Sequence, residues 1–304
     1  MSNLLALHWY IARRQVPFLL LLLFFFLGSI VNTLENGPDF SLTGGIGLAL
    51  AALAAFFIGE QGSSGRLDSE IISGFSRTQI WLSNFLLLLF LGLLLLAAAI
   101  IGEFAAVALK YDFSPYSVSG FGLFLGGAIL NTGAYAAVCT LITLCLAGRS
   151  SGRGVVALIV LVCIFLVFFI WGSALSDMLS EPEYYTYYGY ANGDVIAYGT
   201  SASLDMDALE AYARETGQDH PEEPQFCREY NPQYIDEPLR TQYTQILQFI
   251  PLTQIYMLSE LAFSEPENAP ELFDAASTLW LNAVIIIAGC TAAGILLFKR
   301  RNLD

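Results

Sequence analysis

The sequence predicts an all-α polytopic membrane protein with six transmembrane helices. The chain of 304 residues is 56% hydrophobic and only 13% charged, whereas a soluble domain carries roughly 25% charged residues. The apolar residues gather in six runs, each long enough to cross the ~30 Å hydrocarbon core of a bilayer. These runs are Val16–Leu34, Leu42–Ile58, Ile80–Leu109, Phe121–Ala147, Val155–Leu175 and Leu279–Phe298.

The segment before the first run predicts an N-terminal interfacial helix. Residues 1–14 form an amphipathic pattern, with Trp9 and Tyr10 suited to the headgroup level and Arg13 and Arg14 suited to lipid phosphates. A cleaved signal peptide is the alternative. The apolar run is too long for one, and no small-x-small cleavage site follows it cleanly, so we expect a retained span.

The polar loop between the second and third runs predicts a short cytoplasmic helix. Leu67, Ile71 and Phe75 recur at i, i+4 and i+8, which makes one narrow apolar stripe. Arg66 and Glu70 form an i,i+4 ion pair on the other side of that helix. This pattern indicates more structure than a simple tether between two spans requires.

The same loop contains a predicted glycine corner and the start of a capped long helix. Gly74 ends the short helix, because glycine adopts positive φ at little cost. Ser76 is the expected N-cap, and Gln79 completes a capping box three residues later. Phe75 and Ile80 fit the hydrophobic staple that accompanies such a start.

The third and fourth spans contain polar residues that the bilayer disfavours. Glu103 lies near the outer end of the third span, where it either reaches toward the outer interface or faces a substrate path. In the fourth span, Gly122-x-x-x-Gly126 permits close helix approach, and Asn131 and Thr132 can hydrogen-bond between helices. Glu103 and Asn131 are the candidate substrate-path residues.

Motifs for covalent or metal chemistry are lacking in the sequence. The basic loop Gly148–Gly154 lacks the Gly-Lys-Ser/Thr ending of a P-loop and follows a membrane helix. We therefore expect no catalytic residue and no ATP hydrolysis by this chain. Four of the five cysteines lie in apolar runs without metal-ligand spacing. Cys227 is alone outside them, so no disulfide framework is expected.

The segment Asp177–Asp274 is compositionally distinct and predicts a small folded α+β insert between the fifth and sixth spans. It holds nineteen acidic and three basic residues. Asn192-Gly193 predicts a hairpin turn between two strands, and Asp205–Thr216 a helix. Two apolar-faced helices around Pro251 are expected to dip into the outer leaflet or cover the bundle. The acidity indicates either a solvated surface or a field that concentrates cationic ligands.

The distribution of basic residues predicts the orientation in the cell membrane. With the N-terminus inside, nine of the thirteen lysines and arginines fall in cytoplasmic segments. Both termini are then cytoplasmic and the acidic insert is extracytoplasmic. The expected domains are a transmembrane domain at 1–176, the insert at 177–274, and the last span with its tail at 275–304.

This order of elements resembles the membrane (permease) subunit of type-2 class ATP-binding-cassette (ABC) exporters, especially those of Gram-positive bacteria. The local likenesses are the stretches GRLDSEIISGFSRTQIWLSN, YNPQYIDEPLRTQYTQILQFIPLTQ and GILLFKRRNL. The resemblance implies that the inner loop is a coupling helix, which docks into a separate ABC ATPase subunit. By position, the residues implied in this coupling are Arg66, Leu67, Glu70, Ile71, Gly74, Phe75, Ser76 and Arg77.

The same resemblance implies the partners and cofactors. ATP and Mg would bind the ATPase and not this chain, and a second permease copy or paralogue would complete the transport path. The lipid bilayer is the remaining partner, and no nucleic acid is expected. The transported substrate would be a peptide, lipid or drug.

Two other function classes are alternatives to export. An intramembrane enzyme needs paired catalytic groups at membrane depth, whereas the spans contain Glu103 and no histidine. A non-transporting sensor or immunity protein would bind a ligand through the acidic outer domain. The structured inner loop argues against this second alternative, because passive binding does not require it.

Overall fold

The computed structural model describes residues 2–12, 16–110, 117–146, 153–179, 185–191, 194–199, 225–230, 237–263 and 269–300. It divides into two compact units, one formed by Met1–Gly172 with Ile246–Asp304 and the other by Ser173–Gln245. Several expectations lie outside the described residues. These are the placement of Arg13 and Arg14, the loop residues 148–152, the turn Asn192-Gly193 and the helix Asp205–Thr216.

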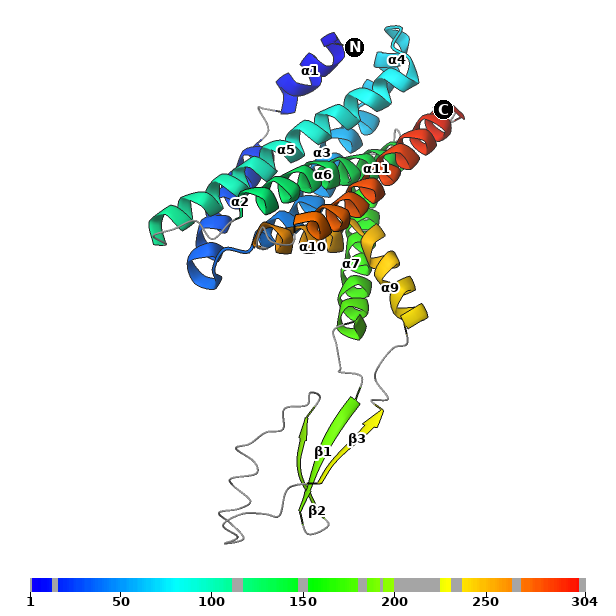
Figure 1. Ribbon diagram of the computed structural model, residues 1–304. Helices are drawn as coiled ribbons and strands as arrows, with labels where there is room; N and C mark the ends of the chain where they lie inside the picture. Colours follow the sequence, from blue (N-terminus) through cyan, green and yellow to red (C-terminus); the bar gives the residue numbers. More distant parts are fainter. Residues whose placement is uncertain are drawn as a thin grey trace. The chain divides into compact units, whose positions relative to one another are not determined.

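Six helices of the described chain are long and apolar enough to cross a membrane, as the sequence predicted. They are α2 (Val16–Asn36), α3 (Ile46–Ser63), α5 (Arg77–Lys110), α6 (Val118–Leu146), α7 (Arg153–Leu179) and α11 (Ala269–Arg300) (Figure 1). The longest, α5, has 34 residues. At 1.5 Å per residue it extends about 51 Å, well beyond the hydrocarbon core.

Shorter helices connect or flank these spans. They are α1 (Ser2–Ala12), the 3₁₀ helix η1 (Ser41–Gly45), α4 (Arg66–Ile72), α9 (Glu237–Phe249) and α10 (Pro251–Phe263). The pair α9 and α10 is bent by 97° at Ile250. The following Pro251 explains the break, because proline lacks the N–H that would continue the helical ladder.

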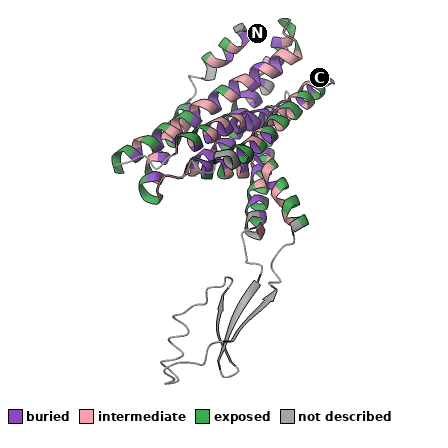
Figure 2. Ribbon diagram, viewed as in Figure 1, coloured by how far each residue is buried: buried purple, intermediate pink, exposed green. Residues whose placement is uncertain are grey.

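The centre of the larger unit is formed by α3, α6 and α5. In their apolar windows 72%, 61% and 44% of the residues are buried, against 22% in α2, 22% in α11 and 17% in α7 (Figure 2). Glycines allow the closest contacts. A Cβ at Gly102 of α5 would overlap the backbone carbonyl oxygen of Phe26 in α2, and one at Gly120 of α6 would overlap that of Leu261 in α10.

The predicted close-approach motif of α6 is only partly used in this way. A Cβ at Gly126 would lie 2.9 Å from the Trp280 ring of α11, so this glycine does admit a neighbour. By contrast, Gly122 has open space where its Cβ would be, among the described residues. The adjacent Gly127, which is not part of the predicted motif, also admits neighbours, because a Cβ there would overlap Leu258 and Trp280.

The smaller unit contains an antiparallel sheet in the strand order β2-β1-β3. Its strands are β1 (Tyr185–Ala191), β2 (Asp194–Gly199) and β3 (Gln225–Tyr230). Ala191 pairs with Asp194 at the end of the antiparallel ladder between β1 and β2. The helix α10 belongs to the larger unit with the spans, although the sequence had grouped it with the insert.

Candidate functional site

The short helix α4 is bounded by two glycines in the left-handed region. Gly65 precedes it with φ 71° and Gly74 follows it with φ 88°. At the C-terminal end, the amide of Phe75 donates to the Glu70 carbonyl at 3.2 Å, and that of Gly74 donates to the Ile71 carbonyl at 3.0 Å. This pair of bonds is a Schellman motif. The predicted glycine corner is therefore confirmed.

The start of α5 carries the predicted capping box. The Gln79 amide donates to Ser76 Oγ at 3.2 Å, and the Ser76 amide donates to Gln79 Oε1 at 2.9 Å. Two of the first amides of the long helix are thereby satisfied. The corner between α4 and α5 is consequently a defined turn with both helix ends capped.

The apolar stripe of α4 faces the protein itself. Leu67 is only 2% exposed, and Ile71 and Phe75 pack against the same core. The apolar side chain on the outward face is Ile72, which is 85% exposed. A four-residue helical spacing predicts which residues share a face, but it does not predict whether that face meets the protein or a partner.

The pair Arg66 and Glu70 is formed, but it does not lie on a solvated side of α4. Arg66 Nε donates to Glu70 Oε1 at 3.1 Å, as the i,i+4 spacing predicted. The same oxygen is 3.0 Å from Nε2 of His8 in α1. Both His8 and Glu70 are buried, at 2% and 5% exposure. The i,i+4 ion pair expected from the sequence is therefore part of a buried contact between α1 and α4.

The burial of His8 was not predicted from the sequence, although the spacing of two residues in α1 indicates it. Leu4 and His8 are one helical turn apart in α1, and both are buried against the bundle. Trp9, expected at the headgroup level, is half-buried and packs edge-on against Phe90 of α5, with ring centroids 5.0 Å apart. The helix α1 is thus attached to the bundle through one face and is not only an interfacial helix.

The corner is also tied to the last span. Arg77 Nη1 donates to the backbone carbonyl of Phe298 at 3.0 Å, close to the C-terminal end of α11. A cation is favourable there, because the helix dipole concentrates negative charge on the last carbonyls. Figure 1 shows α1, α4 and the C-terminal end of α11 at the same end of this unit. The α4 corner is therefore in contact with α1 through His8, continues into α5, and is bonded to α11 through Arg77.

Glu103 binds the connection between α2 and α3. Its two carboxylate oxygens accept the amide hydrogen of Phe40, at 3.3 and 3.1 Å. Phe40 is held at φ 52° and stacks on Phe124 of α6, with centroids 4.4 Å apart. Glu103 is 3% exposed, so the carboxylate acts within the protein instead of reaching toward the outer interface. Its role in a substrate path stays a prediction.

Asn131 holds the tip of the bent pair α9 and α10. Its Nδ2 donates to the Pro251 carbonyl at 2.8 Å. Two further amides, Gln254 Nε2 and Asn282 Nδ2, donate to the Gln248 carbonyl at 2.6 and 3.3 Å. The broken helix frees these carbonyls, and in a membrane they need protein donors. A role for Asn131 in substrate transport stays a prediction.

The position of Asn131 gives the depth of this tip within the bundle. Asn131 lies thirteen residues after Val118, the first residue of α6, or about 20 Å along the helix axis. This is close to the midpoint of α6. At the other end of α10, the Ser117 amide donates to the Ala262 carbonyl at 3.1 Å. The helix α10 therefore runs alongside the N-terminal half of α6, as part of the bundle.

Comparison with known proteins does not assign the chain to a family. The chain matches no protein-family model, and no curated protein matches it significantly. Within the described ranges, no group of three or more His, Cys, Asp or Glu side chains is placed to hold a metal ion. The candidate site is therefore defined by its own geometry.

Proposed function

We propose that this chain is the permease subunit of an ABC exporter and that α4 is its coupling helix. The observation that carries the proposal is the construction of the α4 corner. It is capped at both helix ends, held from beneath by the buried contact with His8, and joined without a break to the long helix α5. A rigid corner transmits a displacement, whereas a flexible loop absorbs it.

The proposal divides the residues of the corner into two roles. Leu67, Glu70, Ile71 and Phe75 hold α4 to the rest of the chain, because their side chains are buried or packed on the core. Contact with the ATPase then falls to the outward face, centred on Ile72. Closure of two ATPase subunits around ATP would push on that face, and α5 would carry the displacement into the membrane.

The remaining parts of the proposal follow from the resemblance to permeases. A separate ATPase subunit binds ATP and Mg, and a second permease copy or paralogue completes the path for a peptide, lipid or drug. The protein lies in the plasma membrane with both termini cytoplasmic and an α+β insert outside. The helices α2 and α7, which are 22% and 17% buried, leave apolar faces for a second copy or for lipid.

The proposal is tested by substituting the exposed residue of α4. Ile72→Asp should release the ATPase subunit or abolish stimulation of its ATP turnover. A buried unpaired charge in an interface costs several kcal/mol, which most single contacts do not offset. The measurement is co-purification with a co-expressed ABC ATPase subunit, followed by ATP turnover in nanodiscs.

Val118→Asp is the matched control. Val118 is an apolar residue 92% exposed at the start of α6, at the opposite end of the bundle. This variant should retain the ATPase and its stimulation. Normal coupling in Ile72→Asp would refute the coupling role of α4. If the wild-type chain never co-purifies with an ATPase, the non-transporting sensor with an acidic outer domain becomes the better hypothesis.

A further inference from the structure

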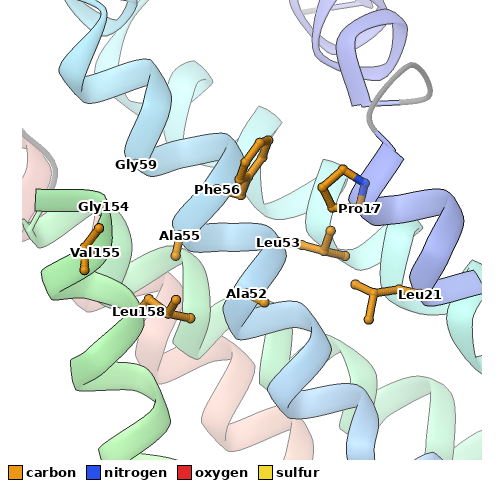
Figure 3. Close-up of a pocket in the computed structure, with 10 residues that line it drawn as sticks. All are labelled: Pro17, Leu21, Ala52, Leu53, Ala55, Phe56, Gly59, Gly154, Val155 and Leu158. Atoms are coloured by element: carbon orange, nitrogen blue, oxygen red, sulfur yellow. The ribbon is translucent and has the colours of Figure 1, made fainter. Parts of the chain in front are cut away.

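A cavity of about 450 Å³ lies between α2, α3 and α7. Figure 3 shows the lining residues of α7 and α2 on the two sides of α3. Its lining residues are Pro17, Leu21, Ala52, Leu53, Ala55, Phe56, Gly59, Gly154, Val155 and Leu158. The volume falls within the range of small-molecule sites, which is roughly 300–1,000 Å³. None of the residues discussed in the α4 corner contributes to the lining.

The cavity exists because two helices meet through glycines. A Cβ at Gly59 of α3 would lie 2.7 Å from the Cα of Gly154 in α7. The two backbones therefore touch directly at this point. With no side chains at the crossing, the helices diverge beside it and leave a space that Phe56 and Val155 only partly cover. Those two side chains are 43% and 60% exposed, so the cavity opens on the outside of the bundle.

The chemistry of the lining requires an apolar occupant. Among the residues that the structure describes, no charged or polar side chain lines the cavity, so a water molecule inside would lack the two to four polar partners that it needs. The opening lies on helix faces that are apolar and exposed, and that a membrane would cover with acyl chains. A lipid acyl chain from the adjoining leaflet can reach this opening, and it is apolar like the lining.

The position of the cavity along the helices indicates the charge of the headgroup. Pro17 and Gly154 are the second residues of α2 and α7, so the cavity begins at the helix ends, where lipid headgroups lie. In the sequence, three arginines and one glutamate stand within four residues of a lining residue. They are Arg13, Arg14, Arg153 and Glu60. This net positive charge in the sequence beside the lining residues favours an anionic headgroup.

We infer that this cavity is a binding site for one acyl chain of an anionic phospholipid, in the leaflet at the α4 end of the bundle. The inference goes beyond the proposed function, because it holds for a permease and for a sensor alike. Its test needs no ATPase. Phosphatidylglycerol carrying a photoreactive diazirine in one acyl chain is added to the purified protein in nanodiscs. Labelled peptides are then mapped by mass spectrometry.

In the wild-type protein, labelling should concentrate on the peptides that contain the lining residues. It should exceed labelling by the matching phosphatidylcholine probe at least fivefold. Ala52→Phe places a ring in the cavity from an exposed position of α3 and should lower this labelling about tenfold. Leu48→Phe is the control. Leu48 is 47% exposed one turn away on the same face and does not line the cavity, so labelling should persist.

Two further variants separate the parts of the inference. Leu158→Ala enlarges the cavity and should keep labelling at or above the wild-type level. Arg153→Gln should lower the preference for phosphatidylglycerol while leaving total labelling by both probes in place. Uniform labelling of all lipid-facing helices, or unchanged labelling in Ala52→Phe, would overturn the acyl-chain site. Equal labelling by the two probes in the wild type would overturn the anionic headgroup.

Discussion

Glu70→Ala tests whether the buried contact between α1 and α4 fixes the N-terminal helix to the bundle. The variant removes the acceptor of His8 Nε2, an atom on a side chain with 0% exposure. A buried donor left without a partner costs about 1–3 kcal/mol. The lost methylene packing adds about 0.8 kcal/mol per buried group. Arg66 contributes little, because its side chain is 22% exposed and can turn to water.

The sum is about 2–4 kcal/mol, which corresponds to a roughly 30- to 900-fold change in an equilibrium constant. Amide hydrogen exchange followed by mass spectrometry measures this change directly. Exchange of the amide hydrogens in α1 should accelerate by that factor. The acceleration cannot exceed the total stability of α1 docking, to which Leu4 and the Trp9–Phe90 contact also contribute. Exchange in the middle of α6 should stay unchanged, since α6 does not depend on this contact.

Two variants make the comparison decisive. Glu70→Gln keeps an oxygen that can accept from His8, so exchange in α1 should fall between the wild type and Glu70→Ala. Glu35→Ala removes an exposed glutamate near the end of α2 and should have no effect. Exchange in α1 within threefold of the wild type in Glu70→Ala would show that the His8 contact does not hold this helix.

Three other substitutions probe separate contacts by thermal unfolding in detergent. Gly74→Ala should destabilise by about 1–3 kcal/mol through backbone strain alone, because φ is 88° and the space for a Cβ is open. Gly102→Ala should lower the unfolding temperature through a steric clash with Phe26, and a normal unfolding temperature would contradict the tight α2–α5 contact. Asn131→Leu should cost about 1–3 kcal/mol, because the buried Pro251 carbonyl loses its donor. A stable variant would refute this role of Asn131.

Several elements of this protein could be predicted from local sequence alone. The six spans follow from the length and hydropathy of single segments, which a bilayer selects without reference to neighbouring helices. The corner at Gly74 and the capping box at Ser76 and Gln79 were also predictable, because their hydrogen bonds join residues at most five positions apart.

Only the tertiary structure decided which face of each helix meets the protein. The spacing of Leu67, Ile71 and Phe75 is the same whether this stripe faces the protein or a partner. Which way it faces depends on the helices packed around α4. The same holds for Glu70, whose partner His8 is 62 positions away. The sequence also did not indicate that Glu103 accepts a hydrogen bond from the amide of Phe40, 63 positions away. Sequence periodicity determines which residues share a face, whereas packing between distant segments determines what that face contacts.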